Sequence, residues 1–315
     1  YRPGRIQVGF LGWPCTIGSS ELLDFAFVDP KSTMVESVAL KRHYEEKLLI
    51  VPPSLFVGDH RRKLPRPQGG ANRFANRSAL NIPNKAFVFA NHNQLFKLNE
   101  ALLDTWGNIL RRARTLNVKC IEQNPSPSTG VLLWLLRHPS AAEVSVREEL
   151  IARGVPKHHV LFSDFAPQDE YVGRVEVADV FLDNVQYNAG ATGVETFWAG
   201  VPMVSMPGDT FVRRMGKSLA AAVNGSEGIV YSLKEYEDLA VAFATKCGQP
   251  GTGAHHGLKH IRKNLKAGHS HEGKSLFNTT QWADKFVRAL RMAVDTTTVP
   301  SSSSTTATTK HCVVV

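Results

Sequence analysis

Residues 180–200 read VFLDNVQYNAGATGVETFWAG and predict a strand, a polar loop and a helix in succession. The strand is continuously apolar rather than alternating, which is typical of strands buried on both faces of a parallel sheet. Small residues at 189–193 let a ligand approach the backbone where the helix begins. The free N–H groups of a first helical turn bind anions, and the helix dipole assists them. Thr192 adds a hydroxyl and Glu195 a carboxylate that could accept ribose hydroxyls, so the segment is consistent with a nucleotide diphosphate site.

The same residues also have a purely structural interpretation. Thr192 can be the N-cap of an ordinary helix, with Glu195 as its capping-box partner three residues later. The local sequence leaves these two interpretations open.

Apolar runs and helical patterns alternate along the rest of the chain. The apolar runs predict strands at 6–13, 25–29, 48–51, 87–90, 131–136, 160–165, 180–183, 202–206 and 229–231. The helical patterns lie at 99–114, 142–153, 192–200, 213–223, 234–246 and 279–294. Because strands and helices alternate from residue 87 onward, the sequence predicts a doubly wound α/β fold with parallel strands.

Three segments differ in composition from the rest of the chain and indicate where its structural units begin and end. Residues 58–83 are basic and rich in turn-forming residues, and they predict a linker between residues 1–57 and a larger unit at 84–294. Residues 117–130 contain two prolines and predict a surface loop. The Ser/Thr-rich residues 295–315 predict a disordered tail.

Two further loops follow predicted strands and carry polar residues. Lys97 comes shortly after strand 87–90 and could place its charge on a diphosphate leaving group, although a single lysine is more often a surface residue. After strand 160–165, the backbone at Ala166 could pair with a base edge and Tyr171 could stack on it; alternatively, Pro167 and its acidic neighbours simply begin a helix. Because three strands end in polar loops at one sheet edge, the pattern favours a nucleotide-type ligand.

The composition excludes several classes of protein. Of the 315 residues, 43% are hydrophobic and 21% are charged, which excludes wholesale disorder, collagen and coiled coil. The cysteines form no CxxC pair, so we expect neither a zinc site nor a disulfide framework. No apolar run is long enough to span a membrane, and no signal peptide opens the chain. Because the chain starts at Tyr1 within a strand-like stretch, we expect a fragment of a longer protein.

The net charge of +9 is concentrated at the end of the chain, where residues 251–315 contribute +6. Such a stretch could bind nucleic acid or acidic lipid. Aromatic residues are not interleaved with these charges, so a solvated basic helix is favoured and no nucleic-acid partner is expected.

The motifs at 11–18, 56–60, 93–97, 131–137, 178–195, 198–204 and 276–280 resemble, in order, those of the protein O-GlcNAc transferase family. The resemblance covers roughly residues 2–294 of the chain. It implies a GT-B fold with two Rossmann-like lobes, of which 1–57 is part of the N-terminal catalytic lobe and 84–294 is the complete C-terminal lobe. It also implies inverting, metal-independent transfer of N-acetylglucosamine from UDP-GlcNAc to Ser or Thr hydroxyls of cytoplasmic and nuclear proteins. Tetratricopeptide repeats would lie upstream of Tyr1.

The resemblance also implies roles for individual residues. Lys97 matches the essential lysine beside the diphosphate, and the other matching positions contact the nucleotide or its sugar. Those positions are Gln94 at the nucleotide, Ala166 at uracil, Thr192 at the diphosphate, Glu195 at the ribose, and Leu11 and Gly12 at the sugar.

Five positions depart from the family pattern. Gln168 replaces a lysine, Tyr171 a stacking histidine, Gly190 a histidine, Ala191 a threonine, and Tyr187 a small cysteine near the N-acetyl group. One cation and two hydrogen-bond donors are thereby lost at the diphosphate, which weakens transition-state stabilisation. Two alternatives follow: a SPINDLY-like protein O-fucosyltransferase that uses GDP-fucose, and an inactive scaffold with a degraded diphosphate site.

Overall fold

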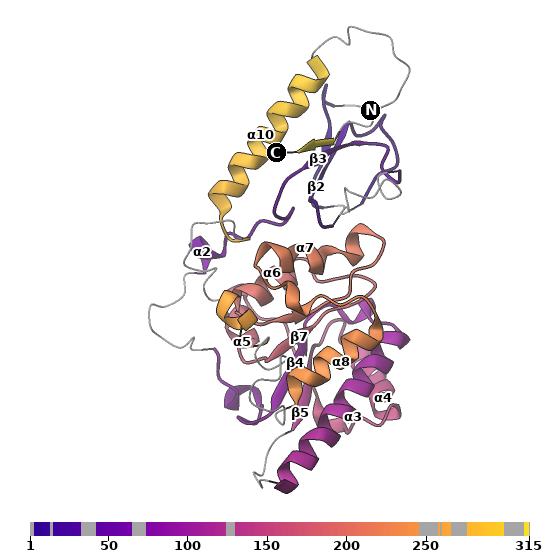
Figure 1. Cartoon of the computed structure of the whole chain (residues 1–315), viewed down its shortest axis with the longest axis vertical. Coiled ribbons are helices and arrows are strands. Elements are labelled where there is room, and N and C mark those ends of the chain that lie inside the picture. Colours follow the sequence, from indigo (N-terminus) through magenta and orange to yellow (C-terminus); the bar gives the residue numbers. More distant parts are fainter. Residues whose placement is uncertain are drawn as a thin grey trace.

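The computed structural model describes residues 3–12, 15–32, 42–64, 74–123, 130–245, 258, 260–265, 276–298 and 312–314. The described strands form two parallel sheets, which are stacked along the long axis of the molecule (Figure 1). We call the part around the five-stranded sheet the C-terminal lobe and the part around the four-stranded sheet the N-terminal lobe.

The sheet of the C-terminal lobe has the strand order β6-β5-β4-β7-β8. Its strands are β4 (Phe87–Asn91), β5 (Val131–Leu136), β6 (Val160–Ser163), β7 (Val180–Leu182) and β8 (Met203–Val204). All residues of β4 and β5 are buried, because helices cover both faces of the sheet. The continuous apolar runs in the sequence reflect this two-sided burial.

The direction of strand addition reverses between β4 and β7. The chain builds outward from β4 through β5 to β6, then crosses back to pair β7 with the other side of β4. The sheet therefore has its topological switch point between β4 and β7. Ligands of open α/β sheets bind at such a switch point.

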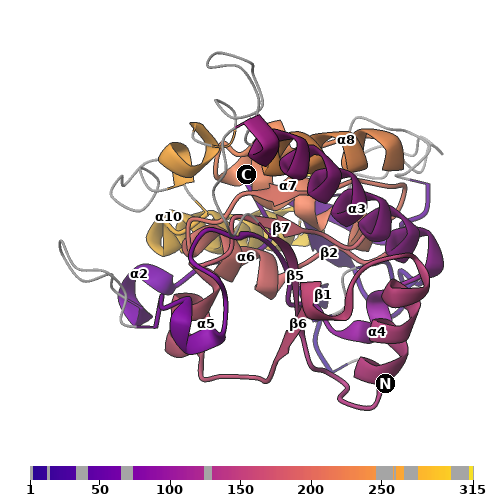
Figure 2. The ribbon, with the colours of Figure 1, turned by 90° about the horizontal axis from the view of Figure 1, so that it is seen from below.

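Helices and short 3-10 segments connect the strands of this lobe. Figure 2 shows α3 and α8 side by side along the sheet. The helices are α3 (Glu100–Gln123), α4 (Ala142–Ala152), α5 (Gln168–Val175), α6 (Ala191–Trp198), α7 (Met215–Ala222) and α8 (Leu233–Ala244). The 3-10 segments are η2 (Leu95–Lys97), η3 (Lys157–His159), η4 (Phe211–Arg213) and η5 (Ser226–Gly228).

The N-terminal lobe combines both ends of the sequence. Its sheet has the order β1-β2-β3-β9, made of β1 (Val8–Gly9), β2 (Phe25–Val28), β3 (Lys47–Ile50) and β9 (Cys312–Val314). The long helix α10 (Thr279–Thr298) packs against this sheet (Figure 1). Ala289 and Ala293 of α10 are fully buried, and Phe286 stacks on Phe27 at 4.6 Å. The last helix among the described residues thus belongs to the first lobe.

Direct contacts join the two lobes. Arg214 at the start of α7 donates from Nε to the carbonyl of Lys31 at 2.9 Å. Ser218 Oγ donates to Ser54 Oγ at 2.9 Å. These bonds hold α7 against the loops that follow β2 and β3.

Several expectations from the sequence need correction. Residues 229–231 form no strand, because Ile229 makes an isolated bridge to Ser205. Residues 117–123, expected in a loop, continue α3. Two parts of the expected disordered tail are ordered: α10 runs to Thr298, and Cys312–Val314 pair with β3. The expected linker at 58–83 contains two short elements, α2 (His60–Lys63) and η1 (Ser78–Leu80).

Candidate functional site

Lys97 lies at the switch point, at the end of the short segment η2 that follows β4. Its ammonium sits 3.9 Å from the ring centroid of Tyr187, which comes from the loop after β7. Partial burial lowers the pKa of Lys97, and the nearby carboxylate of Asp183 opposes this shift. Within the described residues, no carboxylate forms an ion pair with its ammonium. The face of an aromatic ring attracts a cation without neutralising it, so the charge remains available to an anion.

A network of buried amides holds the Lys97 loop in place. Asn184 donates from Nδ2 to the carbonyl of Lys97 at 3.1 Å. Its Oδ1 accepts from Asn91 and Asn93 at 2.6 and 2.8 Å. Its own carbonyl accepts from Asn188 at 2.6 Å. Because all four amides are almost fully buried, the loops after β4 and β7 have one strongly preferred arrangement.

Asp183, directly after β7, anchors the next layer of this network. Its carboxylate accepts from the backbone N–H groups of Asn184 and Ala189 and from the hydroxyl of Ser205. Complete burial raises the pKa of Asp183 to about 6 against these hydrogen bonds, which lower it. By accepting from the N–H groups of Asn184 and Ala189, the carboxylate fixes the backbone of the loop between β7 and α6.

The helix α6 begins without a side-chain cap. Gly190 occupies the N-cap position, and no side chain among the described residues accepts a hydrogen bond from the first turn. The capping box that Thr192 and Glu195 could have formed is absent. Instead, Glu195 accepts from Nε2 of Gln168 at 3.0 Å. The amides of the first turn are thus open to an anion, as the nucleotide interpretation requires.

The residues expected at the base lie beside this turn. Ala166 is half-buried in the loop between β6 and α5, and Gln168 begins α5 after the N-cap Pro167. Asp169 and Glu170 occupy the first turn of α5, so the helix start that the sequence offered as an alternative also exists. Tyr171 packs edge-on against His92 at 5.6 Å between ring centroids. The contact with His92 therefore positions the Tyr171 ring. Its hydroxyl is buried without a hydrogen-bond partner in the described chain.

A cavity of about 330 Å³ lies between the lobes, and four of the expected donor-binding residues line it. These are Leu11 from the N-terminal lobe and Gln168, Ala191 and Glu195 from the C-terminal lobe. Gln94, at the start of η2, is half-buried, whereas Gly12, beside Leu11, is exposed. The structure thus brings Leu11 to the start of α6, although their positions in the sequence are far apart.

Two residues in this region were not assigned from the sequence. His60 lines the cavity, and its Nε2 is buried without a hydrogen-bond partner in the described chain. Burial lowers the pKa of His60 to about 4, so its imidazole is neutral at physiological pH. The ring of Phe56 lies 3.0 Å from where a Cβ on Gly190 would be. Phe56 therefore occupies space next to the position where the family has a histidine.

The buried residues Asp183, Asn184 and Asn188 were also missed as site residues. Their polarity immediately after an apolar strand was a usable signal, since buried polar side chains need partners. Their hydrogen-bond partners could not be predicted, because Asn184 binds Asn91 and Asn93, which lie about 90 residues earlier in the sequence.

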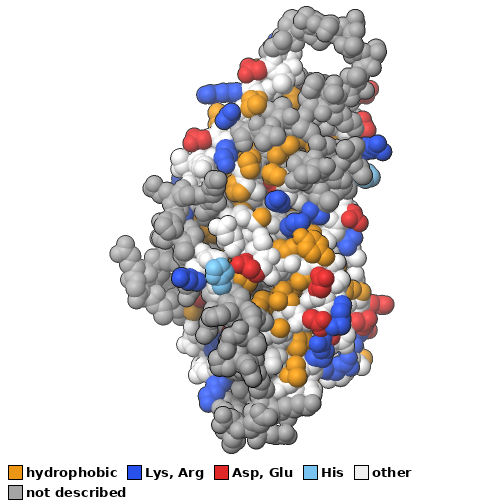
Figure 3. All heavy atoms as spheres, in the orientation of Figure 1, with side chains coloured by type: hydrophobic (Ala, Val, Ile, Leu, Met, Phe, Trp, Pro, Cys, Tyr) orange, Lys and Arg blue, Asp and Glu red, His pale blue; other side chains and the backbone are white. Residues whose placement is uncertain are grey.

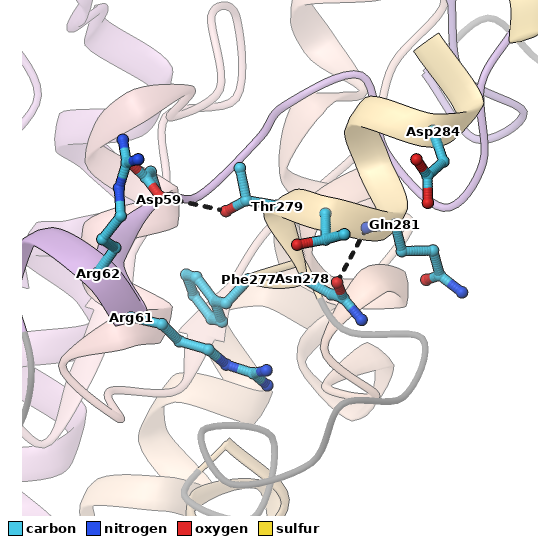
Figure 4. Close-up of a pocket in the computed structure, with 9 residues that line it drawn as sticks. Asp59, Arg61, Arg62, Phe277, Asn278, Thr279, Gln281 and Asp284 are labelled. Atoms are coloured by element: carbon cyan, nitrogen blue, oxygen red, sulfur yellow. Dashed lines mark hydrogen bonds and ion pairs between the residues drawn. The ribbon is translucent and has the colours of Figure 1, made fainter. Parts of the chain in front are cut away.

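A second hollow of about 590 Å³ lies where α2 meets the start of α10 (Figure 4). Asp59 pairs with Arg62 and accepts from Thr279 Oγ1 at 3.4 Å, and Asn278 caps α10 by accepting from the Gln281 N–H. Two arginines and two aspartates line this hollow, so its charges balance. None of the donor residues expected from the sequence lines it.

The described residues lack both a metal-binding cluster and a membrane-spanning helix. No group of three His, Cys, Asp or Glu side chains is placed to hold a metal ion. Within the same residues, no helix is long and apolar enough to cross a membrane.

The chain has two lobes, each built on a parallel sheet, with a cavity between them. This is the architecture of the GT-B class of glycosyltransferase folds. A mutant O-GlcNAc transferase from Thermobaculum terrenum shares the fold, with a TM-score of 0.68 and 22% identity. The match covers 94% of this chain and 50% of that chain.

The chain belongs to glycosyl transferase family 41, whose sequence profile matches residues 1–72 and 70–286. It is 33% identical over 289 residues to a probable UDP-N-acetylglucosamine–peptide N-acetylglucosaminyltransferase, SEC, of Arabidopsis thaliana, covering 91% of this chain and 26% of the relative. It is 26% identical over 250 residues to the Petunia hybrida protein SPINDLY, which carries the same enzyme name, covering 78% and 24%. The chain therefore spans about a quarter of the length of these relatives.

Proposed function

We propose that this chain is the donor-binding part of a protein O-GlcNAc transferase. The donor would be UDP-GlcNAc, and the acceptors would be Ser and Thr hydroxyls of intracellular proteins. The observation that carries the proposal is the position of Lys97, whose ammonium lies at the switch point with no carboxylate partner in the described chain. An unneutralised cation next to an uncapped helix start is suited to a diphosphate.

The proposed chemistry follows from charge. As the sugar departs, negative charge grows on the diphosphate, and Lys97 together with the first turn of α6 would stabilise it. Gln168 and Glu195 would bind the ribose, and Tyr171 would stack on the base beside the backbone of Ala166. Leu11 and Gly12 would contact the sugar from the opposite lobe. The proposed reaction is an inverting transfer that needs no metal ion.

The test is calorimetric titration of this chain with UDP, and with GDP as the competing nucleotide. We expect UDP to bind more tightly than GDP. Lys97→Ala is expected to weaken UDP binding by at least about tenfold, because a hydrogen bond to a charged group contributes about 1.5–3 kcal/mol. Lys157→Ala, which removes an exposed lysine on η3, serves as the control.

Other outcomes would support the alternatives. Tighter binding of GDP would favour a GDP-fucose donor, consistent with the similarity to the SPINDLY protein. Unchanged UDP affinity in Lys97→Ala would remove the proposed role of this residue. A folded chain that binds neither nucleotide would favour a scaffold without donor binding.

A further inference from the structure

Asp183 is a carboxylate directly after β7 whose exposed fraction is 0%. Its Oδ1 accepts from the backbone N–H groups of Asn184 and Ala189, and its Oδ2 accepts from the Ser205 hydroxyl at 2.6 Å. Gly216 in the first turn of α7 packs over the carboxylate, because a Cβ there would lie 2.5 Å from Oδ2. The hydrogen-bond donors are all neutral, so they leave the negative charge of the carboxylate uncompensated.

Lys97 carries the positive charge that interacts with this carboxylate. Burial lowers the pKa of Lys97, and the charge of Asp183 raises it. No direct ion pair joins the two in the described chain, and the ammonium lies over the ring of Tyr187. The other ionisable group that faces Asp183 is Tyr236 of α8, whose hydroxyl donates to the Asp183 carbonyl at 2.9 Å. Burial raises the pKa of this phenol, so Tyr236 stays neutral near pH 7.

The burial of Asp183 strengthens its interactions with other charges. Figure 3 shows acidic and basic side chains interspersed over the visible surface, where water screens them. A buried carboxylate lacks this screening and therefore interacts more strongly with a nearby charge. A diphosphate bound between Lys97 and the first turn of α6 would bring negative charge towards Asp183. The ionised form of Asp183 would then be destabilised relative to the protonated form.

The hydrogen bonds of Asp183 are compatible with a proton on the carboxyl group. Oδ1 can keep both backbone N–H groups, and a proton on Oδ2 can be donated to Ser205 Oγ, because a hydroxyl both donates and accepts. Complete burial raises the pKa of Asp183 to about 6, although its hydrogen bonds and the charge of Lys97 lower it. Protonation therefore removes the charge and preserves the loop between β7 and α6.

We propose that Asp183 is the counter-charge of Lys97 and takes up a proton when a nucleotide diphosphate binds beside Lys97. The proton comes from a buffer acid in solution, which becomes its conjugate base, and an O–H bond forms at Oδ2. The inference rests on the proposed donor site, to which it adds a positioning residue and a linked proton. Because protonated Asp183 does not repel the diphosphate, donor affinity is expected to rise as pH falls from 7.5 towards 6.

The first test is calorimetric titration of this 315-residue chain with UDP-GlcNAc at pH 6.5, in two buffers with different ionisation enthalpies. The dependence of the binding enthalpy on the buffer gives the number of protons taken up. UDP-GlcNAc is used because the terminal phosphate of UDP itself titrates at about pH 6. A tenfold higher proton affinity of Asp183 in the complex corresponds to an uptake of about half a proton at this pH.

Two variants identify the group that takes up the proton. Asp183→Asn keeps the shape and the acceptor of the side chain without its charge, so it should bind UDP-GlcNAc without this uptake. Ser205→Ala removes a hydrogen bond that lowers the pKa of Asp183, so it should move the largest uptake to higher pH. This second variant keeps the test decisive if Asp183→Asn does not fold. Glu195, whose pKa burial also raises, is present in all these chains, so its contribution cancels in the comparison.

The second test needs no nucleotide. The unfolding free energies of wild type, Lys97→Met, Asp183→Asn and the double variant form a cycle that isolates the interaction between the two side chains. We expect a favourable coupling at pH 7.5 and the loss of most of it at pH 5, where Asp183 is protonated. Asp29→Asn is the matched control and should show no coupling to Lys97. This buried carboxylate also accepts from a backbone N–H and a serine hydroxyl, but it lies in the N-terminal lobe.

The two tests separate the failure of this proposal from the failure of the proposed donor site. Equal proton uptake in wild type and Asp183→Asn, or no coupling at pH 7.5, would overturn the role of Asp183 and leave the donor site intact. A wild-type chain that binds no UDP-GlcNAc would overturn the proton uptake together with the donor site. The cycle would still decide whether Asp183 is the counter-charge of Lys97.

Discussion

His92 is a buried imidazole just after β4, and its ionisation couples the fold to pH. It is 4% exposed, packs edge-on against Trp134 at 4.4 Å, and neither ring nitrogen has a partner in the described chain. Burial lowers the pKa of His92 to about 3. In the unfolded chain the pKa of histidine is about 6.5. Between these values the unfolded state binds more protons, so this group lowers the stability of the fold as pH falls below about 6.5.

His92→Phe should remove this pH dependence while keeping an aromatic ring. Relative to wild type, we expect the unfolding free energy of the variant to rise by about 1.4 kcal/mol between pH 7.5 and 5.5. Urea unfolding at the two pH values measures this change. His43→Gln, at an exposed histidine, is the matched control. If the stability difference between His92→Phe and wild type is the same at both pH values, the imidazole of His92 is not the group that titrates.

At the scale of elements, the loop between β7 and α6 is organised by Asn184. This one side chain accepts two hydrogen bonds, one from Asn91 at the end of β4 and one from Asn93 just after it, and donates one to the carbonyl of Lys97. The two loops at the switch point therefore behave as a single unit. Removing the shared amide leaves several buried polar groups without partners, which is costly.

Asn184→Ala is expected to lower the unfolding free energy by about 2 kcal/mol or more. It should also weaken UDP binding, because the backbone of Lys97 is no longer held. Chemical denaturation and calorimetry on the same sample measure both effects. Asn84→Ala, at an exposed asparagine, is the matched control and should change neither. A stable variant with normal UDP affinity would contradict the role assigned to the amide network.

At the scale of the whole molecule, the lobes are joined by polar contacts and by apolar packing, since Phe211 and Met215 of the C-terminal lobe belong to the hydrophobic cluster around β2 and β3. Arg214 is 7% exposed and links its own lobe to the carbonyl of Lys31 in the other, with a further bond to Gly208. We expect Arg214 to help set the relative position of the lobes, and with it the cavity that Leu11 and Glu195 line from opposite sides.

Arg214→Met keeps a long side chain but removes the donors that reach Lys31. We expect a larger radius of gyration by small-angle X-ray scattering and a loss of about 1–3 kcal/mol in stability. Arg213→Met is the control, since its guanidinium binds Val185 within the same lobe. Scattering curves that are the same for both variants would show that Arg214 does not hold the lobes together.

The sequence alone determined the parallel α/β architecture and indicated the sheet edge at which a nucleotide site is expected. Continuous apolar runs such as Phe87–Ala90 and Val131–Leu136 are typical of strands that are covered on both faces, so their pattern predicted the sheet. The carboxyl ends of parallel strands share one edge, so the loops carrying Lys97, Ala166 and Thr192 could be expected together. The prediction of a strand at 229–231 was wrong, because these apolar residues make only a single bridge, from Ile229 to Ser205.

Only the tertiary structure decided which side chains meet at that edge. The contacts of Lys97 with Tyr187, Gln168 with Glu195, and Phe56 beside Gly190 depend on how loops from distant parts of the chain pack. Hydrophobic patterning reports whether a residue is buried, but it contains no information about its partner across such a distance.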